Sequence, residues 1–435
     1  MIYAPAIVLG RAVRVLARWR KPGGGSAVPG LVVNRVAPGF LPQVLNGFPQ
    51  GLIIVSGSSG KSTTTKMLVG VLRAHGLSVF TNASTANIAQ GLTSALLEEV
   101  RLDGTIARDI AVLEMDEGHG AAIAGSLTPR VVALTNVMVD QIDRFHDSDM
   151  VAVMLRKIAA RATGVIVVNA DDDYLRRIAQ VLSVAPGSAR VDSYGVSDAV
   201  LQSNVRGLGY TRTAPQRLSV SDGIVVTEVQ GRSAVISIDG RDHAVALPAR
   251  GTHYAVDAAT ALSTARAALG DRFDASRAVA AIGEIPAVFG RGEVVRVRGQ
   301  NVEFVLVQNP ASFQLNVDSL EPDTEQILII IGSDVRDTSY FWPVDTSSLK
   351  RVHGAAGSKA HDIALQLVYD DVDVERIEPD VGRALDSFLA LPEPATGMKT
   401  IIFSADGMRR TRAHLGLDGN PHDDTPTAAA AQENA

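Results

Sequence analysis

Residues 52–65 read LIIVSGSSGKSTTT, and this stretch decides the fold. A short apolar run predicts a buried strand, and a helical pattern follows the polar residues. Gly57 and Gly60 allow a tight turn whose N–H groups point inward, and the N-terminus of the following helix attracts an anion. Lys61 suits the β- and γ-phosphates of a nucleotide, and Ser62 suits Mg²⁺. The stretch therefore predicts a phosphate loop of the form Gly-x-x-Gly-Lys-Ser, and a plain turn before a helix is the alternative.

The composition predicts an ordinary soluble globular protein. Its 435 residues are enough for about three domains. The hydrophobic fraction is 46%, the charged fraction is 20%, and the net charge of -6 gives no general attraction to nucleic acid. The chain has no cysteine, which excludes thiol catalysis, disulfides and thiolate zinc sites within it. A cytoplasmic location fits these features.

The first 20 residues are apolar but carry Arg11, Arg14, Arg18 and Arg20. No run reaches the ~20 apolar residues that span a bilayer, and the charges follow the apolar part, whereas in a signal peptide they precede it. We predict a helix here. It either packs on the rest of the protein or contacts an anionic membrane surface.

From Gly51 onward, strand and helix patterns alternate. The apolar runs are short, β-branched and unalternating, as expected for parallel strands that are buried on both faces. Besides the strand of the phosphate loop, we expect a helix at 83–97 and strands at 79–80, 109–114, 130–134 and 164–169. The predicted fold class is α/β, with a central phosphate-loop domain built on a parallel sheet.

The pattern changes at residues 190–247, where short alternating segments predict a small antiparallel insert. Its hairpin signals lie at 221–223, 230–231 and 239–240. Helices are predicted at 254–269 and 275–282, and a domain boundary follows at 290–292. Beyond it we predict a smaller α/β domain, with strands at 302–307, 327–331 and 400–403 and helices at 358–367 and 381–389.

These patterns divide the chain into four parts. We expect an N-terminal segment (1–50) that packs on a central domain (51–290), followed by a C-terminal domain (291–417) and a disordered tail (418–435). The insert at 190–247 belongs to the central domain.

Polar residues follow two of the predicted parallel strands, at the sheet edge where ligands bind. Glu114 ends the strand at 109–114 and is followed by Asp116 and Glu117, so a carboxylate could hold Mg²⁺ beside the phosphates. The next strand is followed by Asn136, Asp140, Gln141, Asp143, Arg144 and His146. His146 is either a metal ligand or a solvated loop residue.

Arg291 lies at the predicted domain boundary. A planar guanidinium there could reach a transferring phosphate, and an exposed hinge with a surface salt bridge is the alternative. In the C-terminal domain, Asn309 follows one predicted strand, and Asp334, Asp337 and Asp345 follow the next. These residues either line the carboxyl edge of that domain or are solvated loop residues.

These residues carry a resemblance to a known family. The chain resembles the central and C-terminal domains of the Mur ligases, which join amino acids to peptidoglycan precursors with ATP. The resemblance is carried by the stretches 56–65 and 114–117, by Asn136 with Asp140, and by Arg291 with Glu293. The MurT subunits of lipid II isoglutaminyl synthase are more similar still. Their matching stretches are 24–30, 169–172, 289–291, 309–311 and 358–362. About 50 residues precede the phosphate loop, too few for a UDP-binding domain, and this is typical of MurT subunits.

The sequence also departs from these families. Many MurT subunits contain a four-cysteine zinc ribbon, and this chain has no cysteine, so no zinc is expected. Gln141 stands where Mur ligases have a histidine that binds Mg²⁺. Gln308 replaces the lysine of a Lys-Asn-Pro motif, and Tyr254 and Asp257 stand in a helix motif that usually has two asparagines.

The resemblance implies an ATP- and Mg²⁺-dependent ligase subunit. It would phosphorylate the α-carboxylate of D-glutamate in the lipid II stem peptide at the cytoplasmic face of the membrane, and ammonia from a GatD-type glutaminase would then form D-isoglutamine. The implied catalytic residues are Lys61, Glu114, Arg291 and Asp337, with Asp345 second to Asp337 as the acidic member of the partner's triad. Ser62 and Glu114 would bind Mg²⁺. Nucleotide would be bound by Gly57, Ser58, Ser59, Gly60, Lys61, Ser62, Thr63, Asn136 and Asn309.

Two other functions are compatible with the sequence. One is a stand-alone Mur-like amino-acid ligase related to folylpolyglutamate synthetases. The other is a non-catalytic scaffold for the glutaminase, which the substitutions at Gln308, Tyr254 and Asp257 would favour.

Overall fold

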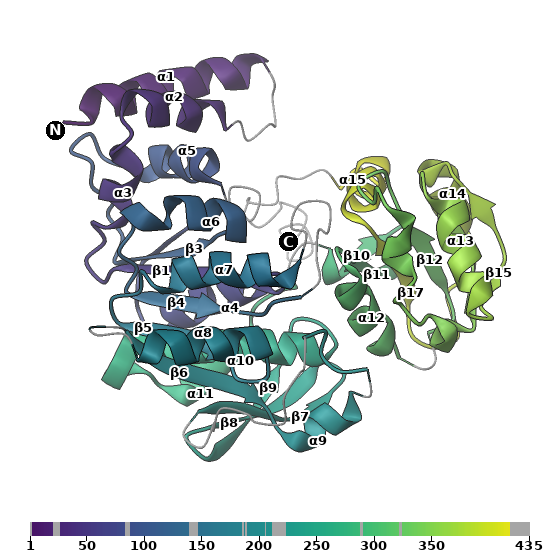
Figure 1. The fold of residues 1–435 in the computed structure, drawn as a ribbon. Helices are drawn as coiled ribbons and strands as arrows, with labels where there is room; N and C mark the ends of the chain where they lie inside the picture. Colours follow the sequence, from purple (N-terminus) through teal and green to yellow (C-terminus); the bar gives the residue numbers. More distant parts are fainter. Residues whose placement is uncertain are drawn as a thin grey trace, which may run out of the picture.

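The computed structural model describes residues 2–20, 27–82, 88–138, 147–184, 187, 189–204, 206–210, 223–287, 290–321 and 324–417. They form a central domain and a smaller C-terminal domain that lies beside it (Figure 1). The part of the chain that is described contains no helix long and apolar enough to cross a membrane.

The central domain is built on one sheet. Its strands in spatial order are β2 (Val79–Thr81), β3 (Ile110–Glu114), β1 (Leu52–Ser56), β4 (Val131–Leu134), β5 (Val165–Asn169), β6 (Arg190–Val196), β7 (Ile224–Gln230), β8 (Ser233–Ile238) and β9 (Arg241–Ala246). From β2 to β7 the neighbouring strands are parallel. The predicted α/β class with a parallel core is therefore confirmed.

Helices cover both faces of this sheet because alternate strand residues point to opposite sides. Ile53 and Val55 of β1 join the cluster formed with α4 (Lys61–Ala74), α10 (Thr252–Leu269) and α11 (Ala275–Gly283). Leu52 and Ile54 join the opposite cluster, formed with α5 (Ala89–Glu99), α7 (Ser148–Ala159) and α8 (Asp173–Ser183). Two short helices, α6 (Glu117–Ile123) and α9 (Asp198–Ser203), follow β3 and β6. Of the helix predicted at 83–97, residues 83–87 lie outside the described residues.

The antiparallel part is smaller than the predicted insert at 190–247. Residues 190–196 form β6, which is parallel to both β5 and β7. The polar residues Arg190 and Asp192 at its start produced the alternating pattern that suggested a hairpin. In the described part of the chain, the antiparallel pairs of this sheet are β7 with β8 and β8 with β9. Their turns contain Gly231, Asp239 and Gly240, all with positive φ, as the hairpin signals at 230–231 and 239–240 predicted. The signal at 221–223 does not join an antiparallel pair, because the strand that follows it, β7, is parallel to β6; residues 221–222 lie outside the described residues.

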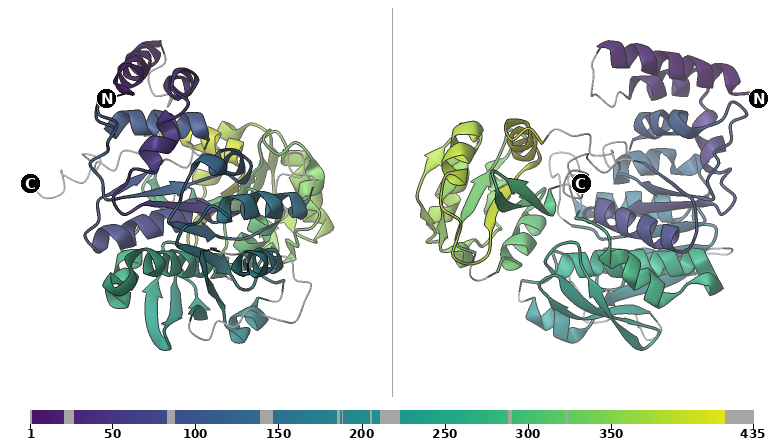
Figure 2. Two further views of the ribbon diagram at one scale, coloured as in Figure 1. Left: turned by 60° about the vertical axis from the view of Figure 1, so that its left-hand side comes forward. Right: turned by 180° about the vertical axis from the view of Figure 1, so that it is seen from behind.

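The N-terminal segment forms α1 (Ala4–Arg20), α2 (Val28–Val36) and α3 (Phe40–Leu45). Helix α2 packs closely against α5 at Gly30. Any larger residue there would clash, since a Cβ atom on Gly30 would lie 1.9 Å from the carbonyl oxygen of Gln90. The Gly30 N–H also donates to Ser94 Oγ at 2.9 Å. Figures 1 and 2 show α1 and α2 as the outermost layer on this side of the central domain.

The C-terminal domain is a second sheet covered by helices on both faces. Its strands in order are β10 (Arg291–Val297), β11 (Gln300–Leu306), β17 (Lys399–Phe403), β12 (Ile327–Ile330), β14 (Gly354–Ala356) and β16 (Ile377–Glu378); a separate pair is β13 (Arg351–Val352) with β15 (Asp373–Val374). The helices are α12 (Pro310–Asp318) and α13 (Ala360–Tyr369) on one face and α14 (Val381–Leu389) and α15 (Ala405–His414) on the other. Short 3-10 turns occur at Thr338–Phe341 and Ser347–Leu349.

Strand β10 was not predicted, because its polar residues and Gly292 suggested only a boundary. The strand pairs with β11 in antiparallel and is interrupted by a bulge between Arg291 and Glu293. Gly292 has a φ of 71° at this bulge.

Ion pairs join the two domains next to this bulge. Arg250 of the central domain binds the buried carboxylate of Glu303 on β11, and Arg232 Nη2 donates to the Gly292 carbonyl at 3.0 Å. Farther along, Arg206 Nη1 lies 2.8 Å from Asp318 Oδ1. These contacts join β10, β11 and α12 to the central domain.

Candidate active site

The phosphate loop has the backbone that its glycines predicted. Gly57 and Gly60 have φ values of 139° and 80°. A Cβ atom on Gly57 would lie 2.2 Å from Thr135 Oγ1, and one on Gly60 would lie 2.2 Å from Asp257 Oδ1. Both positions therefore require glycine for conformation and for space. Helix α4 begins at Lys61, directly after Gly60.

The residues after β4 hold this loop in place. The Ser59 N–H donates to Asn136 Oδ1 at 2.9 Å, and Asn136 Nδ2 donates back to the Ser59 carbonyl at 3.2 Å. The Thr135 hydroxyl donates to the same carbonyl at 2.7 Å, and the Ser58 N–H donates to the Asn136 carbonyl at 2.9 Å. Asn136 therefore supports the loop directly. A contact between Asn136 and a nucleotide stays a prediction.

Lys61 turns its ammonium group back over the loop. Its Nζ donates to the carbonyl of Gly57 and, at 3.1 Å, to that of Ser58. It also lies 3.5 Å from Oε2 of Glu117, the first residue of α6, whose side chain is 7% exposed. The ammonium is thus held where it could neutralise a phosphate. Glu117 was part of the acidic stretch in the sequence but was not assigned a role.

Glu114 ends β3 beside the start of α4. Its backbone is paired with Asn82, which donates from Nδ2 to the Glu114 carbonyl at 3.0 Å and accepts the Glu114 N–H at 2.9 Å. The Ser62 hydroxyl donates to the Glu114 carboxylate. Burial raises the pKa of Glu114, and the nearby Lys61 charge and the Ser62 hydrogen bond oppose this shift.

Ser62 and Glu114 bring two oxygen donors together, as Mg²⁺ requires. The described residues contain no group of three or more His, Cys, Asp or Glu side chains that could hold a metal ion. A magnesium ion here would therefore complete its shell with phosphate oxygens and water, which is its usual mode of binding in nucleotide sites.

Asp257 of α10 lies beneath the phosphate loop. The Thr64 hydroxyl donates to Asp257 Oδ1 at 3.4 Å. Burial raises the pKa of this carboxyl well above its ordinary range, while the Thr64 hydrogen bond and the Arg291 charge lower it. Sequence reasoning noted Asp257 only as a departure from a family motif. Its contact with the loop depends on how α10 packs against α4, which no local pattern reveals.

Arg291 approaches this site from the C-terminal domain. Its charge lowers the pKa of both Glu114 and Asp257, behind the larger contributions described above. Its Nη2 donates to Gln308 Oε1 at 3.0 Å, so Gln308 orients the guanidinium. Of the predicted catalytic residues, the structure thus brings together Lys61, Glu114 and Arg291.

Other predicted site residues lie outside the described residues. These are Asp140, Gln141, Asp143, Arg144 and His146, which follow β4. A further carboxylate that sequence reasoning did not assign is Asp172, which caps α8 and accepts the Val137 N–H at 2.7 Å. Burial raises the pKa of Asp172 to about 6.

The predicted residues of the C-terminal domain make local contacts. Asn309 caps α12, with its Oδ1 accepting the Ser312 N–H at 2.7 Å. Asp334 Oδ1 accepts the Ser404 hydroxyl at 2.6 Å. Asp337 is exposed and accepts the Ser339 N–H at 2.9 Å, and hydrogen bonds from Ser339 lower its pKa.

Asp345 is more constrained than Asp337. It accepts the hydroxyl of Ser347 at 2.6 Å and pairs with Arg206 of the central domain. These contacts, that with Ser347 first, lower the pKa of Asp345 to about 2. Its carboxylate is therefore engaged in the domain junction, whereas that of Asp337 faces solvent.

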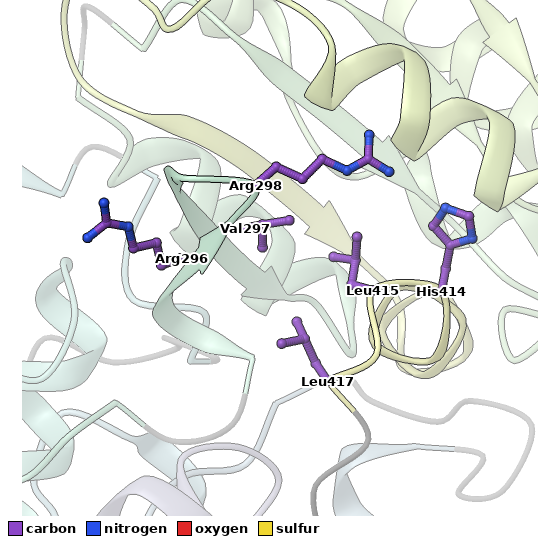
Figure 3. Close-up of a pocket in the computed structure, with 6 residues that line it drawn as sticks. All are labelled: Arg296, Val297, Arg298, His414, Leu415 and Leu417. Carbon is purple, nitrogen blue, oxygen red and sulfur yellow. The ribbon is translucent and has the colours of Figure 1, made fainter. Parts of the chain in front are cut away.

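A hollow of about 240 Å³ lies elsewhere in the C-terminal domain, between β10 and the end of α15 (Figure 3). Two of its basic side chains are already paired, because Arg298 and His414 both contact Asp386. The third, Arg296, points away from them in Figure 3. The converging polar groups of the phosphate loop make that loop the better candidate site.

Two protein-family models match the chain. The Mur ligase middle domain matches residues 55–265, and the MurT ligase C-terminal domain matches residues 306–403. The first ends within α10, and the second runs from the end of β11 to the end of β17.

The MurT subunit of lipid II isoglutaminyl synthase (glutamine-hydrolyzing) from Streptococcus pneumoniae is 24% identical over 396 residues, which cover 82% of this chain and 84% of that protein. The subunit of the same name from Staphylococcus aureus is 29% identical over 154 residues, which cover 35% of this chain and 34% of that protein. Among solved structures, the folylpolyglutamate synthase of Mycobacterium tuberculosis complexed with ADP and AMPPCP superposes with a TM-score of 0.61 at 16% identity. That match covers 94% of this chain and 98% of the synthase, and it shows the fold alone.

Proposed function

Because the chain belongs to the Mur ligase family and carries the C-terminal domain of the MurT ligases, we propose that it is the ligase subunit of a glutamine-dependent amidotransferase. It uses ATP to activate the α-carboxylate of D-glutamate in the stem peptide of lipid II, and ammonia then converts this group to the amide of D-isoglutamine. The observation that carries the proposal is the phosphate loop, on which Lys61, Ser62, Glu114 and Arg291 converge.

A carboxylate reacts with ammonia only after one of its oxygens becomes part of a good leaving group. In the first step, a carboxylate oxygen forms a bond to the γ-phosphorus while the bond from that phosphorus to the bridging oxygen of ADP breaks. In the second step, ammonia forms the C–N bond, inorganic phosphate leaves with the C–O bond electrons, and the nitrogen loses a proton to solvent. The product is an amide together with ADP and phosphate.

The residues of the site match the charge that develops in the first step. The Lys61 ammonium lies over the loop, where it would bind β- and γ-phosphate oxygens. Arg291 would contact the transferring phosphoryl group from the other domain, with Gln308 fixing its orientation. The oxygens of Ser62 and Glu114 would hold Mg²⁺, which supplies further neutralisation of phosphate charge.

The ammonia must come from outside this chain. Glutamine hydrolysis by a class I glutaminase needs a cysteine nucleophile, and the sequence contains no cysteine. We therefore assign glutamine hydrolysis to a GatD-type partner. Asp337 completes its Cys-His pair, because the Asp337 carboxylate is exposed and ionised, whereas Asp345 is bound to Arg206.

The test measures ADP release by the purified chain, with and without a GatD-type glutaminase. We expect release to require lipid II and a nitrogen source, with ammonium serving for the chain alone and glutamine serving only when the glutaminase is present. Release that depends on an added amino acid and not on ammonia would identify a stand-alone ligase. No nucleotide binding in calorimetry would identify a scaffold.

A further inference from the structure

Among the described side chains, those exposed on the outer side of α1 are apolar. The exposed residues on this side recur every three or four positions, which places them on one stripe of the helix. They are Ile2, Pro5, Val8, Leu9, Ala12, Val15, Leu16 and Trp19. Ile2 and Trp19, near the two ends of the stripe, are 87% and 82% exposed. The outer side of α2 continues the surface with Val28, Leu31 and Val36, all exposed. We call these eleven residues the outer apolar face.

Two charged residues of α1, Arg11 and Arg14, contact the rest of the protein beside the buried Ile7. Arg11 donates to the carbonyl oxygens of Leu97, at 3.1 Å, and Val100 at the end of α5. Arg14 pairs with Glu98 of α5 at 2.6 Å. The helix is thus anchored to the protein by the buried Ile7 together with Arg11 and Arg14, and a second apolar side points outward. This orientation needs an apolar environment outside the domain.

The segment that carries this face is strongly basic. Residues 1–50 contain five arginines, one lysine and no Asp or Glu, although the whole chain has a net charge of -6. In the sequence, Arg18, Arg20 and Lys21 stand next to Trp19, and Arg35 lies in the last turn of α2. Apolar side chains rimmed by Lys and Arg, with a tryptophan near one end, are typical of helices that lie in the interface of an anionic membrane.

We propose that the outer apolar face is a docking surface for an anionic phospholipid bilayer. Helix α1 lies in the plane of the interface, with its apolar stripe among the upper acyl chains and its basic residues at the level of the phosphates. Trp19 sits at the head-group boundary, where its ring is partly apolar and partly hydrated. Figures 1 and 2 place α1 and α2 at the outer limit of the molecule, so a flat surface can reach them. The proposal does not rest on the proposed ligase activity, because membrane binding and amidation are measured in separate experiments.

The first test uses tryptophan fluorescence of the full chain. The sequence has two tryptophans, so Trp342→Phe leaves Trp19 as the only one. We expect vesicles of phosphatidylcholine with phosphatidylglycerol to shift the Trp19 emission to the blue, and brominated acyl chains to quench it. Vesicles of phosphatidylcholine alone should give a much smaller effect, and high salt should weaken binding to the anionic vesicles. Unchanged emission with anionic vesicles would overturn the proposal.

The second test compares two matched substitutions by vesicle flotation. Leu16→Glu changes a residue of the outer apolar face that is 63% exposed, and Leu365→Glu changes one on α13 that is 59% exposed. We expect the partition coefficient to fall about tenfold or more for the first variant and to stay within about twofold for the second. Both variants should retain the parent's circular dichroism and nucleotide binding.

Three outcomes would contradict the proposal. One is an equal effect of the two substitutions. Another is a dimer in sedimentation that Leu16→Glu dissociates, because the face would then bind a second copy of the chain. The third is a glutaminase complex that Leu16→Glu breaks, because the partner protein would then cover the face. None of these results depends on catalysis, so the proposed ligase function stands or falls independently.

Discussion

The carboxyl edges of the two sheets differ in how they hold their polar residues. In the central domain, Glu114 and Asp257 are only 5% and 6% exposed, and they contact the phosphate loop itself. In the C-terminal domain, Asp337 is exposed and bonds to its own turn. The carboxyl edge of the central sheet thus carries buried carboxylates that contact the phosphate loop, whereas the carboxyl edge of the C-terminal sheet carries a solvated loop.

The comparison shows which chemistry each edge can perform alone. Buried carboxylates with raised pKa values are costly to the fold, and such costs are typical of active sites. A solvated aspartate cannot catalyse a reaction by itself, but it can orient a catalytic residue of a partner protein that binds over it. We therefore assign phosphoryl transfer to the central edge and partner activation to the C-terminal edge, and the following experiments test this division.

The largest effect is expected from Lys61→Ala. Loss of the ammonium removes a charge that the transferring phosphate needs, so amidation with either glutamine or ammonium should fall by about 10³-fold or more. The exposed Lys157 of α7 provides the control, and Lys157→Ala should keep parental activity. Near-normal amidation by Lys61→Ala would show that the phosphate loop is not the catalytic site.

Asp337→Asn should separate the two edges. We expect glutamine-driven amidation to fall by about 10³-fold, because a neutral amide cannot stabilise the charged histidine of the partner. Ammonium-driven amidation should be unchanged, because the phosphate loop is intact. Asp345→Asn is the comparison, and its glutamine-driven loss should be much smaller because this carboxylate is engaged with Arg206. Equal glutamine-driven rates in parent and Asp337→Asn would reduce Asp337 to a surface residue.

A smaller effect is expected from Glu114→Gln, which should raise the Tm but weaken nucleotide binding. The raised pKa of Glu114 means that, between its ordinary value of 4.5 and the raised value, the native state binds more protons than the unfolded state. The unfolding free energy of the metal-free protein therefore falls as pH rises through this window. The neutral glutamine avoids this loss, so its Tm should exceed that of the parent by a few degrees at pH 8 and match it near pH 4, below the ordinary pKa.

Glu114→Gln should nevertheless weaken Mg²⁺-dependent nucleotide binding, which calorimetry at pH 8 can measure. Glu228 of β7, an exposed carboxylate in the same domain, is the control, and Glu228→Gln should change neither quantity. A lower Tm for Glu114→Gln at pH 8 would mean that the carboxylate stabilises the fold, which would contradict the contrast between the two edges.

The smallest effect is expected from chelation of zinc. Strands β7 to β9 have their own buried residues, including Ala234, Ile236 and Ile238 on β8, so the hairpins should need no metal. EDTA should leave the Tm unchanged, and elemental analysis after dialysis should find no stoichiometric zinc. Zinc that survives dialysis would mean that ligands other than cysteine hold it.

Much of the central site could be predicted because its signals are local. A tight turn between a strand and a helix needs glycines at fixed positions, and Gly57 and Gly60 have the positive φ values that this requires. Likewise, Glu114 could be placed at the sheet edge because its strand ends where the apolar run ends. Short-range patterns of this kind depend on backbone geometry, which adjacent residues determine.

The sequence by itself determined the α/β class, the phosphate loop, the absence of cysteine chemistry and the basic character of residues 1–50. The tertiary structure alone decided that Asp257 lies beneath the loop, that Arg291 approaches it from the second domain, and that α1 turns its apolar side outward. The physical reason is that these three features depend on contacts between segments far apart in the chain. Helix periodicity shows that α1 has an apolar stripe, but only the packing of Arg11 and Arg14 against α5 shows which side faces out.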